Sequence, residues 1–282
     1  MAQSIAQGIY NLTMSSLNPS TTLSTAITIA RGAGAILRAA GSDREADFKL
    51  NETDLVTEYD RRSEAFIVSA IREAFPDHAL RGEEGARVNS GAEYEWLIDP
   101  LDGTTNFAHG LPIYGVVLAL LHHGDPVVGV IYDPTRDECF TTTKGGGAFL
   151  GDSPMHVSAR QPLSRALLVT GFPYDVRTNP DNNIARFSQF AVRARAVRRL
   201  GSAALDLAYV AAGRFEGYWE SWLNPWDVAA GVLMVREAGG RVTNYDDQPI
   251  PVPNTGLVAS NGLIHADMLT VIREGDNAPR PD

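Results

Sequence analysis

The sequence contains a single cysteine, Cys139, among 282 residues. One thiol cannot form an intrachain disulfide, and it cannot supply the thiolate clusters of structural zinc and iron–sulfur sites. Long apolar runs are missing too, because no stretch reaches the roughly 18 residues that suggest a membrane-spanning helix. We therefore expect a protein of a reducing compartment without a membrane partner, and the predicted location is the cytoplasm.

Basic residues are scarce relative to acidic ones. Lys and Arg number 24 against 34 Asp and Glu, which leaves a formal net charge of −10. Proteins that bind nucleic acid offer a basic surface to the phosphate backbone, so this balance argues against nucleic acid as a partner. The one dense basic cluster is Arg193, Arg195, Arg198 and Arg199. A second phosphate, an RNA, a partner subunit and a solvated edge all remain possible roles for it.

Charge is absent from the first thirty residues of the chain. A secretory signal would need a basic start and a compact apolar stretch, whereas polar residues interrupt this segment. We expect residues 1–23 to form a flexible lead-in, residues 24–150 an N-terminal α+β half, and residues 151–282 a C-terminal α/β half. No Pro/Ser-rich linker divides the two halves, so we expect them to pack as one compact unit.

Hydrophobic periodicity predicts the elements of each half. Helical spacing covers Ser24–Ala40 and Glu58–Phe75, and the polar segment Gly41–Thr57 between them suits a loop or hairpin. Short apolar runs separated by turns then predict a meandering sheet. After about Gly151, strands and helices alternate. This order predicts an α/β fold, a layered α+β sandwich in which helices cover sheets.

The stretch Trp96–Phe107 carries the strongest chemical signal. Asp99 follows a buried apolar run, and Asp102 comes three residues later, before Gly103 and Thr104 at an expected helix start. Two carboxylates so close repel each other unless a cation lies between them, and oxygen-only ligands favour Mg²⁺ or Mn²⁺. A helix N-terminus with Gly and Thr also suits a phosphate. The alternative is a plain turn, because Asp-Pro and Asp-Gly are common turn pairs.

Further acids extend this pattern. Glu83 and Glu84 lie between two glycines, and Asp227 follows Pro225 at a helix start. A solvated loop would explain the glutamates, and a first-turn acid would explain Asp227. Acids at the ends of several elements are nevertheless explained better by one multi-metal site than by an unrelated local role for each acid. The six histidines are scattered without metal-ligand spacing, so we expect them to have structural or surface roles.

These motifs resemble those of the inositol monophosphatase-like phosphatases, which are magnesium-dependent and lithium-sensitive. Trp96–Phe107 is similar to the first signature of that family, and Trp226–Gly231 followed by Glu237–Gly240 is similar to the second. The resemblance runs from about Ser24 to Arg273, nearly the whole chain. It implies a sugar-phosphatase αβαβα fold, hydrolysis of a phosphate monoester, and a homodimer.

The resemblance also implies a set of metal ligands. Glu83, Asp99 and the backbone carbonyl of Leu101 would hold a first Mg²⁺, and Asp99, Asp102 and Asp227 would hold a second. Glu83 would also face a weaker third site, so the cofactor would be two or three Mg²⁺ ions. Divalent ions placed in this way activate a water and stabilise the leaving alkoxide, which removes the need for a protein nucleophile.

By the same resemblance, Gly103 and Thr104 would hold the substrate phosphate. Asp60 and Thr104 would position the attacking water and help to deprotonate it, which makes Glu83, Thr104 and Asp60 the expected catalytic residues. Only two of the 24 basic residues are lysines. One of them, Lys49, falls where the family has a flexible-loop lysine, although an ordinary exposed lysine is the alternative.

Two segments of the resemblance concern the leaving group. Glu220 would accept hydrogen bonds from polyol hydroxyls, and the backbone of Gly201, Ser202 and Ala203 would line the sugar pocket. Hydroxyls are donors, so an acid suits a neutral polyol, and myo-inositol 1-phosphate is the first expected substrate. Fructose 1,6-bisphosphate, histidinol phosphate, galactose 1-phosphate and 3′-phosphoadenosine compounds remain alternatives. A regulatory binding protein would require the acids to be lost, and they are present.

Overall fold

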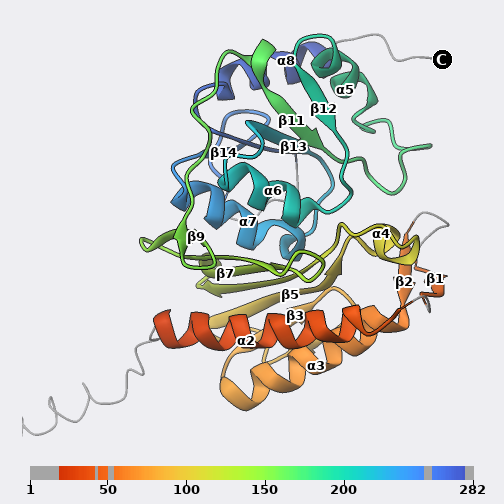
Figure 1. Ribbon diagram of the computed structural model, residues 1–282, viewed down its shortest axis with the longest axis vertical. Helices are drawn as coiled ribbons and strands as arrows, with labels where there is room; N and C mark the ends of the chain where they lie inside the picture. The colour runs from red at the N-terminus through yellow and green to blue at the C-terminus, as the bar shows by residue number, and fades with distance from the viewer. Residues whose placement is uncertain (1–18, 42–43, 50–53, 251–255, 277–282) are drawn as a thin grey trace, which may run out of the picture.

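The computed structural model describes residues 19–41, 44–49, 54–250 and 256–276, which form five stacked layers (Figure 1). From the bottom of Figure 1 these are a helical pair, an eight-stranded sheet, a second helical pair, a five-stranded sheet and a third helical pair. The pairs are α2 (Pro19–Arg38) with α3 (Glu58–Ala74), α6 (Ala203–Ala211) with α7 (Pro225–Glu237), and α5 (Ile184–Ala191) with α8 (His265–Asp276). This αβαβα order confirms the predicted layered sandwich.

The larger sheet has the strand order β10-β9-β8-β7-β6-β5-β3-β4. Strands β3 and β5 run parallel, and the other neighbours are antiparallel. The bounds are β3 (Ala79–Gly82), β4 (Arg87–Val88), β5 (Tyr94–Asp102), β6 (Gly115–His122), β7 (Asp125–Asp133), β8 (Glu138–Thr143), β9 (Gly147–Leu150) and β10 (Ser153–Pro154). The meander of β5 to β8 follows the predicted run of apolar segments and turns.

The smaller sheet has the order β12-β11-β13-β15-β14, with β11 parallel to both β12 and β13. Its strands are β11 (Leu167–Thr170), β12 (Ala196–Arg198), β13 (Gly217–Glu220), β14 (Arg241–Asn244) and β15 (Leu257–Ser260). Strands β1 (Ala46–Phe48) and β2 (Leu55–Thr57) form a separate antiparallel pair within the polar segment before α3, where we expected a loop or hairpin. The remaining elements are the single turn α4 (Thr104–Ala108) and the 3₁₀ turn Leu163–Arg165.

Strand β6 shows why the larger sheet is buried on both sides. Its residues are apolar without interruption from Val116 to Leu121, and successive side chains of a strand point to opposite faces. Val117 and Ala119 therefore join the core beneath α6 and α7, whereas Val116 and Leu118 join the core beneath α2 and α3. The first of these cores contains residues from both predicted halves of the chain.

The boundaries differ from the predicted ones at several places. Helix α2 begins at Pro19, so residues 19–23 are helical, whereas we had assigned them to a flexible lead-in; residues 1–18 lie outside the described part of the chain. Strand β5 continues to Asp102 instead of ending before Asp99. The short strands β3, β4, β9 and β10 were not predicted. Within the described ranges, no helix has the length and hydrophobicity to cross a bilayer.

His265 joins the smaller sheet to α8. Its side chain is fully buried, with Nε2 2.9 Å from the Thr243 hydroxyl of β14 and Nδ1 2.9 Å from the Ser260 hydroxyl of β15. Burial, helped by the nearby positive charge of Arg241 and opposed by Asp247, lowers the pKa of His265 from 6.5 to about 4. The folded protein therefore holds this imidazole neutral at pH values where an unfolded chain would protonate it.

This depressed pKa predicts an acid-labile C-terminal sheet. The contribution of His265 to stability should be fully present above pH 6.5 and should be lost as the pH falls towards 4, because protons then bind the unfolded chain preferentially. The loss should amount to roughly 3 kcal/mol. Urea unfolding of the wild type and of His265→Gln at pH 7.5 and pH 5 measures it. Equal pH dependence in the two proteins would contradict this account.

Candidate active site

A cavity of about 980 Å³ opens between the two sheets, where the ends of several strands and helices meet. All of the predicted site residues except Asp60 line it: Lys49, Glu83, Asp99, Leu101, Asp102, Gly103, Thr104, Gly201, Ser202, Ala203, Glu220 and Asp227. Asp60 is completely buried behind the wall and contacts Thr104. The fold therefore gathers residues that are up to 178 positions apart, from Lys49 to Asp227, around one space.

The parallel pairing of β3 and β5 brings the first acids together. The Glu83 N–H continues that ladder by donating to the Ile98 carbonyl at 3.1 Å, so Glu83 follows β3 directly beside Asp99. Strand β5 bulges between Asp99 and Asp102, and the Leu101 N–H donates to Asp99 Oδ1 at 3.0 Å. A bulge changes the direction of side chains along a strand. Here it lies between the two acids that face the cavity.

The N-terminus of α6 holds Asp102. The Ser202 hydroxyl donates to Asp102 Oδ2 at 2.6 Å, the Ala204 N–H donates to the same oxygen at 2.8 Å, and the Ala203 N–H donates to Oδ1 at 3.3 Å. A helix N-terminus favours negative charge because its first N–H groups lack intrahelical acceptors. Ser202 and Ala203 line the cavity as expected, but the structure also gives them a contact with Asp102 that the sequence did not indicate.

Asp227 occupies the first turn of α7. The Asn224 N–H donates to Asp227 Oδ2 at 2.7 Å, so the carboxylate reaches back over the start of the helix. The first-turn interpretation is therefore correct, and it is compatible with a site role because Asp227 also lines the cavity. The indole N–H of neighbouring Trp226 is buried at the same wall without an acceptor among the described residues.

Ionisation of Asp99, Asp102 and Asp227 is unfavourable in this cavity. Burial raises the pKa of Asp99 and of Asp227 well above the usual range, and the negative charges of Glu83 and Asp102 raise both further. Burial raises the pKa of Asp102 to about 6, against the opposing effect of its three hydrogen bonds. Like charges in a poorly solvated place disfavour one another, and a bound cation removes that penalty.

Lys49 supplies positive charge at the edge of the cluster. Its ammonium lies 2.9 Å from Glu83 Oε1 and 2.6 Å from Glu84 Oε1, which makes it more than an ordinary exposed lysine. Burial raises the pKa of Glu84 to about 7, and the contact with Lys49 opposes that rise. The ammonium group of Lys49 thus contacts two carboxylates, those of Glu83 and Glu84.

Glu64 of α3 was missed by the sequence analysis. Its carboxylate is buried and accepts from the Glu84 N–H at 2.9 Å and from the Ala86 N–H at 3.1 Å, so it holds the loop that carries Glu83. A Cβ atom on Gly82 would lie 2.1 Å from Glu64 Oε2, so a side chain at this position would collide with Glu64. Gly82 is therefore required for the contact between this loop and Glu64, and the sequence alone gave no signal that the Glu64 carboxylate would be buried.

Asp60 and Thr104 form the predicted pair. The Thr104 hydroxyl lies 2.9 Å from Asp60 Oδ1 and 3.0 Å from the Leu101 carbonyl. The other oxygen, Asp60 Oδ2, accepts from the N–H of Thr57 at 2.8 Å and from its hydroxyl at 2.5 Å. Burial raises the pKa of Asp60 despite these bonds. The contact exists because Thr104 begins α4 immediately after Gly103, whose φ of +94° lets the chain turn sharply out of β5.

Glu220 also lines the cavity. It ends β13, and the Tyr218 hydroxyl donates to its Oε2 at 2.7 Å. Burial raises the pKa of Glu220 to about 7, and the positive charge of Arg199 opposes that rise. Gly171 makes room for the carboxylate, because a Cβ atom there would lie 2.1 Å from it. Asp206 of α6, which the sequence analysis missed, is buried in the same wall with Oδ1 unbonded among the described residues.

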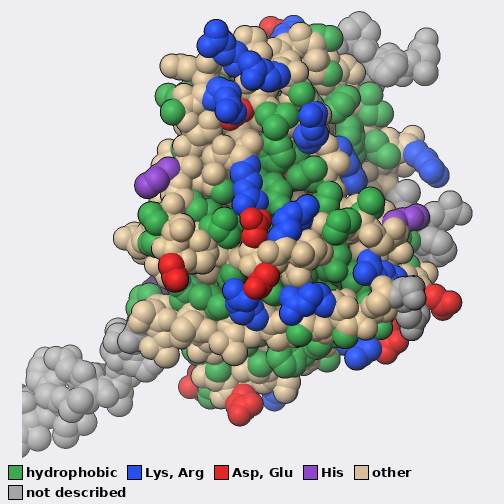
Figure 2. Space-filling view, viewed as in Figure 1, with side chains coloured by type: hydrophobic (Ala, Val, Ile, Leu, Met, Phe, Trp, Pro, Cys, Tyr) green, Lys and Arg blue, Asp and Glu red, His purple; other side chains and the backbone are tan. Residues whose placement is uncertain are grey.

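The basic cluster does not act as one surface. Arg199 lines the cavity, whereas Arg193 points towards α8 and pairs with Glu274 at 2.5 Å. Figure 2 shows the wider pattern on one face, where Lys and Arg side chains are spread from top to bottom and Asp or Glu side chains lie beside several of them. The solvated-edge interpretation therefore fits Arg193, while Arg199 belongs to the site.

Comparison with known proteins identifies the family of this chain. A sequence profile of the inositol monophosphatase family matches residues 18–276. An inositol-1-monophosphatase of Synechocystis is 47% identical over 216 residues, which cover 76% of this chain and 75% of that protein. A putative Nus factor SuhB of Neisseria meningitidis is 43% identical over 253 residues, which cover 89% of this chain and 97% of that protein.

Solved structures agree as well. An inositol monophosphatase from Anabaena (Nostoc) superimposes with a TM-score of 0.83 at 45% identity, covering 92% of this chain and 97% of that one. The match therefore extends over nearly the whole fold. The chain belongs to the inositol monophosphatase family, a family of metal-dependent phosphoric monoester hydrolases.

Proposed function

We propose that this protein hydrolyses a polyol monophosphate, with myo-inositol 1-phosphate as the first substrate, and that it uses two or three Mg²⁺ ions. The observation that supports this most strongly is the convergence of Glu83, Asp99, Asp102 and Asp227 on one cavity. Structural ion pairs would bring acids and bases together, whereas here acids outnumber bases. Functional sites are where proteins maintain such unfavourable charge arrangements.

The residues fit divalent metal ions of the hard class. The donors at the cavity are carboxylate oxygens together with the Leu101 carbonyl, which is the ligand set that Mg²⁺ prefers. Burial and the negative charge of Glu83 raise the pKa of Asp99, so ionisation of both carboxyls is unfavourable unless a cation lies between them. We assign Glu83, Asp99 and Leu101 to one ion, Asp99, Asp102 and Asp227 to the second, and Glu83 to a weaker third.

When bound, the ions supply a Lewis acid for the phosphate and lower the pKa of a coordinated water. The chain itself orients the reactants. Gly103 and Thr104 would hold the phosphate at the start of α4, and Asp60 would accept the proton of the Thr104 hydroxyl as that oxygen receives a proton from the attacking water. The raised pKa of Asp60 suits this exchange, because a general base works best when its pKa is near the working pH. Lys49 would offset excess charge at Glu83.

Glu220 supports a hydroxyl-rich leaving group. Its carboxylate lies at the wall that a leaving alcohol would face, and Tyr218 fixes one of its oxygens so that the other can accept from a hydroxyl. Gly201, Ser202 and Ala203 line the same side of the cavity. Several relatives are named inositol-1-monophosphatase, which agrees with a polyol ester.

Other esters share the same chemistry. A fructose 1,6-bisphosphatase, a histidinol phosphatase or a 3′-phosphoadenosine phosphatase would need the metal ligands unchanged, and Arg199 at the cavity could contact a second phosphate. Relatives named Nus factor SuhB also fall in the family, so we treat a regulatory role as additional to catalysis. We propose a homodimeric, lithium-sensitive cytoplasmic enzyme, as the sequence analysis indicated.

The first prediction concerns metal and substrate together. Phosphate release from inositol 1-phosphate should require added Mg²⁺, should stop with a chelator and return with excess Mg²⁺, and should fall at high Li⁺. In a panel at fixed Mg²⁺, kcat/KM should be higher for inositol 1-phosphate than for fructose 1,6-bisphosphate, histidinol phosphate and 3′-phosphoadenosine compounds. Absence of metal-dependent release from every ester would contradict the proposal.

The second prediction concerns Asp102→Asn. Loss of one ligand charge should lower kcat by at least about 100-fold, the scale of removing one preorganised electrostatic group. Because burial disfavours the charged form of Asp102, the metal-free variant should be at least as stable as the metal-free wild type. Its melting temperature should rise less on addition of Mg²⁺. Exposed Asp152→Asn is the matched control; comparable losses in both variants would contradict the ligand role.

The third prediction concerns Glu220→Gln. Removing an ionised acceptor should lower kcat/KM for inositol 1-phosphate by about 10- to 100-fold, the range expected for a hydrogen bond to a charged group. Phenyl phosphate, which lacks polyol hydroxyls, serves as the control substrate and should be affected much less. The preference of the wild type for inositol 1-phosphate should also weaken below pH 7, where Glu220 takes up a proton. Equal losses on both substrates would place Glu220 outside the leaving-group pocket.

A further inference from the structure

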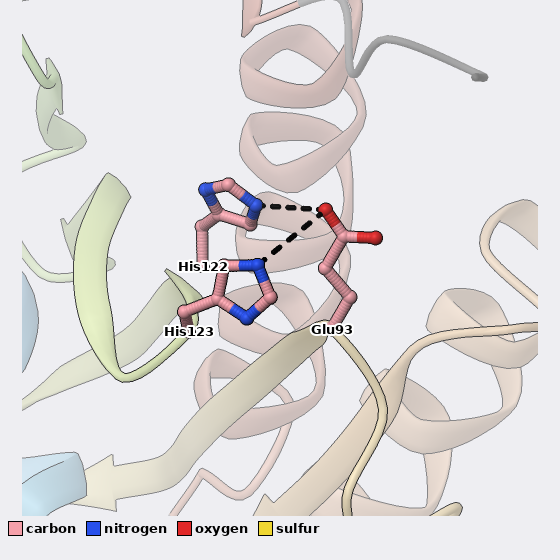
Figure 3. A group of neighbouring side chains, drawn as sticks. All are labelled: Glu93, His122 and His123. Carbon is pink, nitrogen blue, oxygen red and sulfur yellow. Dashed lines mark hydrogen bonds and ion pairs between the residues drawn. The ribbon is translucent and has the colours of Figure 1, made fainter.

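A second group of potential metal ligands lies at the opposite end of β5. Glu93, His122 and His123 each offer one ligand atom, and these atoms all lie within 4.8 Å of one another (Figure 3). Strand β5 runs from Tyr94, beside this group, to Asp102 in the cavity. At about 3.3 Å per residue the two ends are about 26 Å apart, so the group is separate from the acidic cavity.

The hairpin between β6 and β7 places both imidazoles on one side. His122 pairs with Asp125, which leaves His123 and Gly124 as a two-residue turn with φ values of +50° and +86°. Consecutive side chains of an extended strand point to opposite faces, but a turn with two positive φ values breaks that alternation. In Figure 3 both rings face the carboxylate of Glu93.

Glu93 is anchored to the same turn by the backbone. Its carbonyl accepts from the His123 N–H at 3.0 Å, immediately before the pairing of Tyr94 with His122 begins. The side chain then returns towards the turn, with Oε1 2.8 Å from His122 Nε2 and 3.8 Å from His123 Nε2. One carboxylate oxygen therefore lies within reach of both imidazoles.

Ring stacking orients one of the ligands before any metal binds. The His122 ring stacks on Tyr94 at 4.7 Å, and Tyr94 stacks in turn on His78 at 5.0 Å. The Trp96 indole fixes His78 by donating to its Nδ1 at 3.1 Å. This row of rings holds His122 against the sheet, so binding needs little reordering of that side chain, whereas His123 is 72% exposed and open to solvent.

The spacing fits a tetrahedral ion. Ligands about 2.1 Å from Zn²⁺ in tetrahedral geometry lie about 3.4 Å from each other. The two nitrogen–oxygen distances, 2.8 and 3.8 Å, lie on either side of that value. Two imidazoles and one carboxylate, with a fourth position open to water, form a set typical of Zn²⁺ and unlike the all-oxygen set that Mg²⁺ prefers.

We propose that Glu93, His122 and His123 form a zinc-binding site that joins the β6–β7 turn to the start of β5. The ion would replace the proton that now links His122 to Glu93, because an imidazole must give up a ring proton at the nitrogen that binds a metal. Bound Zn²⁺ would cross-link two segments 29 residues apart at the edge of the larger sheet. This site is independent of catalysis in the cavity.

Calorimetric titration of Zn²⁺ into metal-free protein, with Mg²⁺ in large excess to occupy the acidic cavity, tests the proposal. We expect one zinc equivalent in the wild type. The affinity should fall by more than about tenfold in His122→Gln and in His123→Asn, because losing even a hydrogen-bonding partner of a ligand costs about that much. Asn tolerates the positive φ of position 123, which keeps the turn intact.

His156→Gln is the matched control, because His156 is also exposed but lies outside this group. It should bind zinc like the wild type. Circular dichroism and Mg²⁺-dependent melting verify that each variant is folded, and Co²⁺ substitution should give a visible absorption band that both site variants lose. Unchanged zinc affinity in His122→Gln and His123→Asn would overturn the proposal and place any bound zinc at the acidic cavity.

Discussion

The repulsion between carboxylates in one poorly solvated cavity is the constraint on which this structure depends. Burial makes Asp99, Asp102 and Asp227 costly to ionise, and the negative charge of Glu83 adds to that cost for each of them. A fold without a function for these charges would gain stability by losing them. The fold instead surrounds them with donors, so that their positions are set before any cation binds.

The donors come from helix N-termini and from a bulge in a strand. The start of α6 supplies N–H groups and a hydroxyl to Asp102, the start of α7 supplies one N–H to Asp227, and the bulge in β5 supplies one to Asp99. Helix N-termini and bulges are the places where backbone N–H groups lack regular partners. The same groups that would be unsatisfied at the ends of elements thus hold the acids in place.

Layering explains why these ends meet. The larger sheet is buried on both faces, and α6 and α7 lie between it and the smaller sheet. Their N-termini therefore open towards the end of β5, where Asp102 leaves the sheet. Glu64 and Asp60 on α3 reach the same place from the other face, one holding the loop of Glu83 and the other contacting Thr104. The site therefore depends on how the layers pack against one another, because no single helix or strand carries all of its residues.

Much of the fold and of the site could be predicted from the sequence. Periodicity located the long helices and the central strands, because a buried face repeats at 3.6 or 2 residues and Gly or Pro ends it. Motif order identified the acids that line the cavity. Glu64 and Asp206 could not be found in this way, since a carboxylate inside a helical period resembles a solvated one until the packing around it is known. Likewise, the different surroundings of Arg193, which pairs with Glu274 of α8, and of Arg199, which lines the cavity, become visible only when the helices and sheets are packed.

The sequence by itself determined most of the element types and the acidic chemistry, because these follow from local periodicity and residue type, whereas the order of the layers was implied by the family resemblance. Only the tertiary structure decided which side chains contact each other. Ser202 binds Asp102, and Tyr218 orients Glu220. Glu93 lies beside His122 and His123, two histidines that show no metal-ligand spacing in the sequence. Such contacts join residues far apart in the chain. Their geometry depends on a positive-φ turn, a bulge and helix termini whose relative placement is set only when the layers pack.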